Sequence, residues 1–94
     1  MLTIIVTYRC KESKRAEFYD ALCELGIRSA SLQEAGCVQY DYFFAAENES
    51  DLLLVEQWED HPTHEAHCAT ERFAKLQALK PLYCDFSSAK KIDH

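Results

Sequence analysis

The sequence predicts an α+β fold in which one antiparallel sheet carries helices on one face. Three observations predict it. β-branched and aromatic residues alternate over residues 2–10, a 3.6-residue apolar repeat occupies residues 13–36, and two further alternating segments flank a polar turn. The resulting order, β-α-β-β-α-(α)-β, is that of the split βαβ, or ferredoxin-like, arrangement. At 94 residues the chain has the length of one domain, so we expect residues 1–94 to form a single domain.

The first helix is expected to begin after Ser13, a residue type favoured at helix N-caps, and to end near Gly36. Gly26 lies inside it and costs roughly 1 kcal/mol against Ala, so we expect a kink or a close backbone approach there. The predicted apolar stripe consists of Phe18, Leu22, Leu25, Ser29 and Leu32.

Residues 37–46 and 52–59 are predicted to form a hairpin around the polar residues 47–51. Alternation would place one set of side chains of the first strand on a common face: Val38, Tyr40, Tyr42 and Phe44. Asp60 or His61 would then cap a short helix, and Thr70 a second one that Pro81 would stop. A weaker strand over residues 84–92 closes the sheet.

Two of the predicted strands are apolar on both faces. The strand over residues 52–59 has Leu52 and Leu54 on one face and Leu53 and Val55 on the other, and residues 2–10 behave alike. Helices can cover only one face of this sheet. Because C2 dimers are the commonest oligomers, we expect an identical subunit to pack on the second face, sheet to sheet.

Composition excludes several function classes. Ten basic against sixteen acidic residues give a net charge of −6, the wrong sign for binding a nucleic acid backbone. Five cysteines without a C-x-x-C pair fit reduced thiols better than a disulfide framework or a zinc ribbon. The sequence shows neither a signal peptide pattern nor the ~20 apolar residues that span a bilayer, so we expect a cytoplasmic protein without membrane contact. With two glycines only, it has no Gly-rich nucleotide or flavin motif.

The densest chemistry lies in residues 55–68, which hold three of the four histidines and the only tryptophan. Trp58 would end a strand where a pocket opens between sheet and helices, so its ring belongs either to the core or to a substrate platform. His64 and His67 are acid/base candidates or, alternatively, hydrogen-bonded helix histidines. His64 and Cys68 have ligand-like i, i+4 spacing, but no H-E-x-x-H or C-x-x-C pattern accompanies them, and we expect no metal site.

Several segments together resemble the antibiotic biosynthesis monooxygenase (ABM) family along most of the chain. In that family an E-x-G-C-x-x-Y segment opens the second strand, an E-x-W-E-D run closes the third, and a His lies nine residues after the Trp. The corresponding segments here are residues 34–40, residues 56–60 and His67, with Phe73 following, and the opening residues 2–6 are also similar. The resemblance implies a dimeric α+β barrel.

The resemblance also separates subgroups of the family. Haem-degrading members have Asn, Trp and His at the positions held here by Thr7, His67 and Gln77, so haem is not expected. Members that oxidise polyketide phenols have Asn four residues before the Trp and Tyr six after it, where this chain has Leu54 and His64.

The quinol monooxygenase members are most similar, with E-Q-W-E and His at the sixth and ninth positions after the Trp, which here are His64 and His67. They usually add a second His before the next aromatic residue, where this chain has Glu71 and Arg72 ahead of Phe73.

The resemblance therefore implies a cofactor-independent monooxygenase acting on a quinol or another small phenolic substrate with dioxygen. His67 or His64 would be the base, Trp58 and Phe73 the walls, Leu54 part of the apolar floor, and Thr7 a further substrate contact. The purified protein should then be colourless. Two alternatives remain open: a non-catalytic small-ligand-binding dimer, and a non-oxidative isomerase of the same fold.

Overall fold

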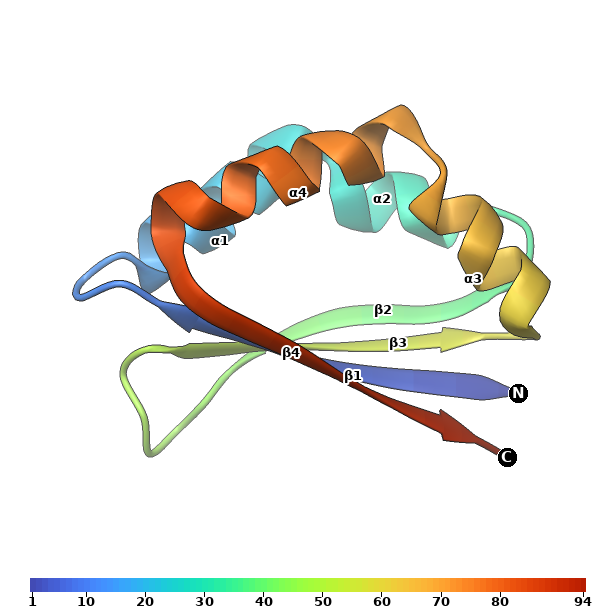
Figure 1. The fold of residues 1–94 in the computed structure, drawn as a ribbon, viewed down its shortest axis with the longest axis horizontal. Helices are drawn as coiled ribbons and strands as arrows, with labels where there is room; N and C mark the ends of the chain where they lie inside the picture. The colour runs from blue at the N-terminus through green and yellow to red at the C-terminus, as the bar shows by residue number, and fades with distance from the viewer.

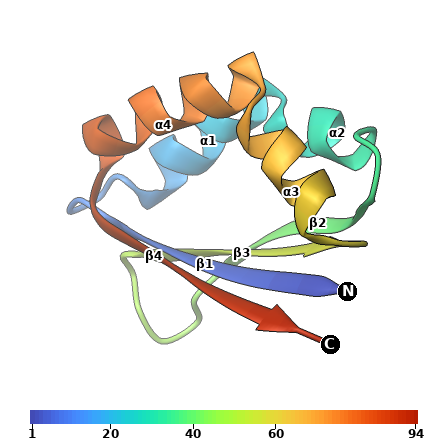
Figure 2. The ribbon, with the colours of Figure 1, turned by 45° about the vertical axis from the view of Figure 1, so that its right-hand side comes forward.

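A four-stranded antiparallel sheet lies beneath four helices in the computed structural model, which describes residues 1–94 (Figure 1). The strands are ordered β2-β3-β1-β4, and all helices lie on one face of the sheet in both views (Figures 1 and 2). The elements are β1 (Leu2–Cys10), α1 (Arg15–Leu25), α2 (Ile27–Leu32), β2 (Cys37–Phe44), β3 (Asp51–Trp58), α3 (His61–Cys68), α4 (Glu71–Tyr83) and β4 (Cys84–Asp93). The predicted α+β, ferredoxin-like fold is confirmed.

The core lies between the sheet and the helices because alternate strand residues point inward. β3 shows this period without interruption, with every second residue from Leu52 to Trp58 buried. The helices contribute their own buried apolar side chains from α1, α2 and α4: Phe18, Leu22, Ile27 and Leu76.

The predicted first helix is in fact two helices, because Gly26 adopts the left-handed conformation (φ 70°) and ends α1. Its N–H bonds to the carbonyls of Leu22 and Cys23, and no atom lies within 4 Å of the position of a Cβ, so the glycine serves a kink rather than a close approach. This break changes which side chains of α2 face the core. Ile27 and Ser31 are buried, whereas the predicted Ser29 and Leu32 are exposed.

Three further local predictions are wrong. Ser13 is not the N-cap, since it has a φ of 62° and Lys14 occupies the cap position. Val38 is half exposed because it is the extra residue of a β-bulge and leaves the inward alternation. Pro81 does not stop α4, which continues to Tyr83, since a proline in the last turn removes only one helical hydrogen bond. By contrast, the caps at Asp60 and Thr70 are confirmed.

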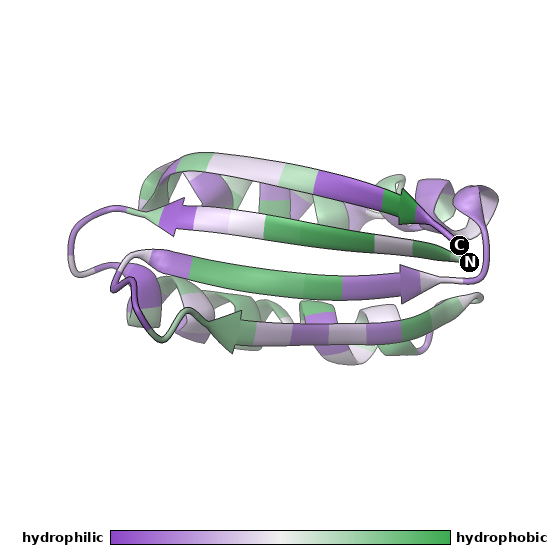
Figure 3. Ribbon diagram, turned by 90° about the horizontal axis from the view of Figure 1, so that it is seen from below, coloured by the Kyte–Doolittle hydropathy of each residue, from purple (hydrophilic) through white to green (hydrophobic).

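The face of the sheet opposite the helices is open, and the two central strands, β1 and β3, are hydrophobic along much of their length (Figure 3). In the register of the strands, Phe43, Leu53 and Thr7 form one row across it, and Val55 and Ile5 meet in the next. No helix of the chain lies over these residues.

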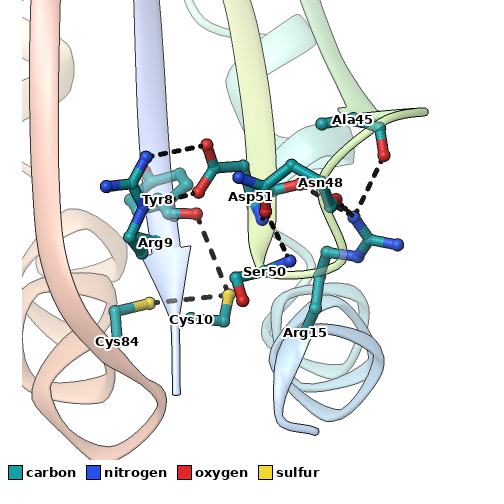
Figure 4. A network of polar contacts seen from close by, with 9 residues as sticks. All are labelled: Tyr8, Arg9, Cys10, Arg15, Ala45, Asn48, Ser50, Asp51 and Cys84. Carbon is teal, nitrogen blue, oxygen red and sulfur yellow. Dashed lines mark hydrogen bonds and ion pairs between the residues drawn. The ribbon is translucent and has the colours of Figure 1, made fainter. Parts of the chain in front are cut away.

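Polar contacts fasten the β2–β3 turn to the start of α1 (Figure 4). The Arg15 guanidinium donates to the carbonyls of Ala45 and Asp51, each at 3.2 Å, and Arg9 pairs with the Asp51 carboxylate at 3.0 Å. Nearby, the sulfurs of Cys10 and Cys84 are 3.9 Å apart, and all five cysteines are free. None of the helices has the length and apolar character needed to cross a membrane.

Candidate functional site

A cavity of about 290 Å³ lies between the inner face of the sheet and helices α3 and α4. Its apolar wall comes from β1 and α4 and includes Ile4, Val6, Phe73 and Leu76. Side chains with acid, base or thiol groups are also part of the lining: Glu56, His64, Cys68, Lys80 and Lys91. Ligand pockets commonly measure ~300–1,000 Å³, so this cavity suits a small ligand.

His67 on α3 adjoins this cavity and is almost completely buried, with 1% of its side chain exposed. Its Nδ1 lies 2.8 Å from Oε1 of Glu34. Because a carboxylate only accepts hydrogen bonds, Nδ1 carries the proton of this bond, and Nε2 is an acceptor whenever the ring is neutral. Nε2 is buried without any hydrogen-bond partner. An orphaned acceptor of this kind costs about 1–3 kcal/mol and is ready to bind a donor.

The turn around Gly36 brings Glu34 and α3 together. Gly36 has a φ of 84°, and a Cβ on it would lie 2.5 Å from Cγ2 of Thr63 in the first turn of α3. Its carbonyl accepts the N–H of Glu59 at 2.8 Å. Only glycine permits this approach, and so the E-x-G motif positions both the carboxylate and the helix that carries its histidine partner.

Aromatic rings enclose the His67 imidazole. Its ring centroid lies 4.8 Å from that of Trp58, 5.4 Å from Phe73 and 5.8 Å from Tyr40. Phe73 and Tyr40 also line the cavity, so they separate it from the histidine. A second hollow of about 360 Å³ reaches His67 from the Glu34 side.

His64 lines the cavity directly, one turn of α3 before Cys68. Its Nε2 lies 3.4 Å from the Cys68 sulfur. Burial, assisted by Lys91 and His67, lowers the pKa of His64 to about 4, so the ring is neutral at neutral pH. Burial also raises the pKa of the Cys68 thiol. No group of three or more His, Cys, Asp or Glu side chains is arranged to hold a metal ion.

Comparison with known proteins agrees with the fold. The family description "antibiotic biosynthesis monooxygenase" matches residues 1–79. This chain belongs to the antibiotic biosynthesis monooxygenase family. No curated protein matches it.

Solved structures support this membership. A Bacteroides thetaiotaomicron protein of unknown function, described as a possible oxidoreductase, has a TM-score of 0.87 and 25% identity over 99% of this chain and 96% of that one. A structure named antibiotic biosynthesis monooxygenase has a TM-score of 0.82 and 26% identity over 100% of this chain and 98% of its own. The protein PA3566 of Pseudomonas aeruginosa, with 24% identity over 99% of this chain and 92% of its own, shares the fold at a TM-score of 0.84.

Within this ABM domain, Glu56 is a site residue that the sequence reasoning did not select. It is 5% exposed and lines the cavity, and its Oε1 accepts the indole N–H of Trp58 at 2.9 Å. Burial raises its pKa, although the Trp58 hydrogen bond and the proximity of His67 oppose the shift. The alternation of β3 could have identified it, because Glu56 occupies an inward position between Leu54 and Trp58.

Three other predicted site residues, Thr7, Leu54 and Trp58, do not line the cavity. Thr7 lies on the open face between Leu53 and Ser88 and does not line the cavity, so its contact with substrate stays a prediction. Leu54 points inward but is a fully buried core residue that does not line the cavity. Trp58 is fully buried as well. Its ring packs against His67, and its indole N–H donates to Glu56.

Proposed function

We propose that the protein is a cofactor-independent monooxygenase that oxidises a quinol or another small phenolic ring with dioxygen. Membership of the ABM family supports the reaction class. The observation that carries the proposal is the buried His67 imidazole, whose Nδ1 is held by Glu34 and whose Nε2 has no partner. A fixed tautomer with a free, water-excluded lone pair is the arrangement that a general base requires.

The reaction would begin with a substrate hydroxyl donating its proton to Nε2 of His67. The resulting phenolate is electron-rich enough to reduce dioxygen without a metal or flavin. One oxygen atom ends on the ring and the other in water, so that a quinol and O₂ become a hydroxyquinone and H₂O. Glu34 would stabilise the imidazolium that forms, and the rings of Trp58, Tyr40 and Phe73 would exclude bulk water from the anion.

Access to the base would depend on Phe73. Its ring, which is only partly buried, lines the cavity and contacts His67, so its rotation would open a path from the cavity to Nε2. His64, which is neutral at pH 7 and lines the same cavity, would contact the substrate without competing for its proton, since a group with a pKa of about 4 is a weak base.

The catalytic unit would be a homodimer. The open face of the sheet carries Phe43, which is exposed in a single chain, and Ile5, Leu53 and Val55, which are partly exposed. A second copy would remove these side chains from water. Its partners would otherwise be the small aromatic substrate and dioxygen.

Oxygen uptake with a panel of quinols tests the proposal. His67→Gln should lower the rate by roughly 10²–10⁴-fold, as loss of a general base usually does, because Gln offers no comparable lone pair. His61→Gln is the matched control, because His61 lies on the same helix, is exposed and pairs with Asp93 at the surface. It should retain full activity.

Other outcomes identify the alternatives. Full activity in His67→Gln together with loss of activity in His64→Gln would identify His64, about one helical turn earlier, as the base. Tight binding of quinols without oxygen uptake would indicate the ligand-binding dimer, and conversion of a substrate without oxygen uptake would indicate the isomerase.

A further inference from the structure

Two lysine residues line the cavity and form no ion pair. Lys80 comes from α4 and Lys91 from β4, and neither takes part in any of the ion pairs of the molecule. Lys80 contacts only the Ser87 hydroxyl, at 3.4 Å, and the face of the Tyr8 ring. These two side chains are therefore free to bind an anion.

The lining of the cavity is positively charged although the chain as a whole is acidic. Its charged groups are two lysines and one carboxylate, that of Glu56, whereas the whole chain carries a net charge of −6. His64 adds no charge at neutral pH. Two lysines beside an apolar cavity give it a local positive charge that favours an anionic ligand.

The strand register places opposite charges at the two ends of one row across the inner face. Lys91 on β4 is opposite Ile4 on β1, and Ile4 is opposite Glu56 on β3. Adjacent strands lie about 4.8 Å apart, so the backbone positions of Lys91 and Glu56 are separated by roughly 10 Å with an apolar residue between them. Lys91 also lowers the pKa of both Glu56 and His64, which agrees with its position beside the cavity.

We propose that the cavity binds an aromatic ring bearing an anionic group, with the anion at Lys80 and Lys91 and the ring hydroxyl toward Glu56 and His67. Ile4 supplies the apolar surface beneath the ring. This inference concerns the substrate class of the proposed oxygenase. Turnover of such a ligand rests on the proposed function, whereas its binding does not.

Binding of 2,5-dihydroxybenzoate and of its uncharged methyl ester, measured by calorimetry without oxygen, tests the inference. The acid should bind about tenfold more tightly than the ester, a preference that corresponds to about 1.4 kcal/mol, within the range of a charge-assisted hydrogen bond. Added salt should reduce the preference, because these lysines are only partly buried or exposed.

Substitutions assign the preference to the two lysines. Lys80→Met and Lys91→Met should each weaken it, and the double variant should abolish it while leaving affinity for the ester unchanged, which also shows that the variant is folded. Lys75→Met is the matched control, because Lys75 lies on α4 but contacts Glu71 and does not line the cavity. It should keep the full preference.

Equal affinity for acid and ester, no binding of the acid, or a preference that survives in the double variant would overturn the inference. Its failure is distinguishable from failure of the proposed function. Selective binding of the acid without oxygen uptake supports the binding inference and contradicts the oxygenase, whereas oxygen uptake with uncharged quinols alone does the reverse.

Discussion

Gly36 allows the close approach that brings Glu34 to α3, and Gly36→Ala is therefore an informative perturbation. The residue has a φ of 84°, and an added Cβ would lie 2.5 Å from Cγ2 and 2.6 Å from Oγ1 of Thr63. Gly26 provides a control within the same chain. It has a φ of 70°, but a Cβ there would meet nothing within 4 Å.

The two glycines separate backbone strain from steric overlap. A left-handed conformation costs a residue with a Cβ roughly 1–2 kcal/mol, and this cost applies to both positions. Forcing atoms into packed space typically adds about 1–3 kcal/mol, and this cost applies only to Gly36. Gly36→Ala should therefore destabilise the protein by about 2–5 kcal/mol, and Gly26→Ala by about 1–2 kcal/mol.

Urea denaturation of both variants measures these losses, and oxygen uptake measures the effect on the site. Displacement of the first turn of α3 should disturb the 2.8 Å contact between His67 and Glu34, so Gly36→Ala should lose activity and Gly26→Ala should not. Adding Thr63→Gly to Gly36→Ala should recover part of the steric cost, as a non-additive double-mutant cycle. If Gly36→Ala destabilises the protein no more than Gly26→Ala, then Thr63 does not crowd a side chain at position 36.

Three further predictions concern assembly and pH. Light scattering at micromolar concentration should give twice the 10.9 kDa chain mass, with an interface of at least ~1,200 Å², and Val55→Glu on the open face should give the monomer; a wild-type monomer would contradict the dimer. Burial raises the pKa of Glu56, so its stabilising contribution is present below pH ~4.5 and is lost as the pH rises through the folded-state pKa. Glu56→Gln should accordingly gain more stability relative to wild type at pH 7 than at pH 4, and thermal melts that show the same difference at both pH values would exclude this. The pKa of His64 is lowered from 6.5 to about 4, so its contribution is present above pH 6.5 and is lost as the pH falls toward 4. His64→Gln should lose less stability than wild type over that interval, and parallel losses would show that His64 is not the group responsible.

The sequence by itself determined the features that depend on neighbours along the chain. Alternation over β1 and β3, the helix caps at Asp60 and Thr70, and the order of the elements follow from local periods and local hydrogen bonds. These were sufficient for the fold class. The family motifs added Glu34 and His67 as parts of one pattern, without saying that they touch.

The tertiary structure decided which side of each helix and strand faces the core, and which residues distant in the sequence come into contact. The left-handed Gly26 turned the following helix so that Ile27, and not Leu32, is buried. Thr7 lies on the open face, and the sequence does not reveal this, because β1 is apolar on both sides and a period of two cannot tell which side meets the helices. The Glu34–His67 contact joins residues 33 positions apart, and Lys91 reaches the cavity of Glu56 only through pairing of β4 with β1. No local pattern in the sequence encodes such contacts, because packing of the sheet against the helices creates them.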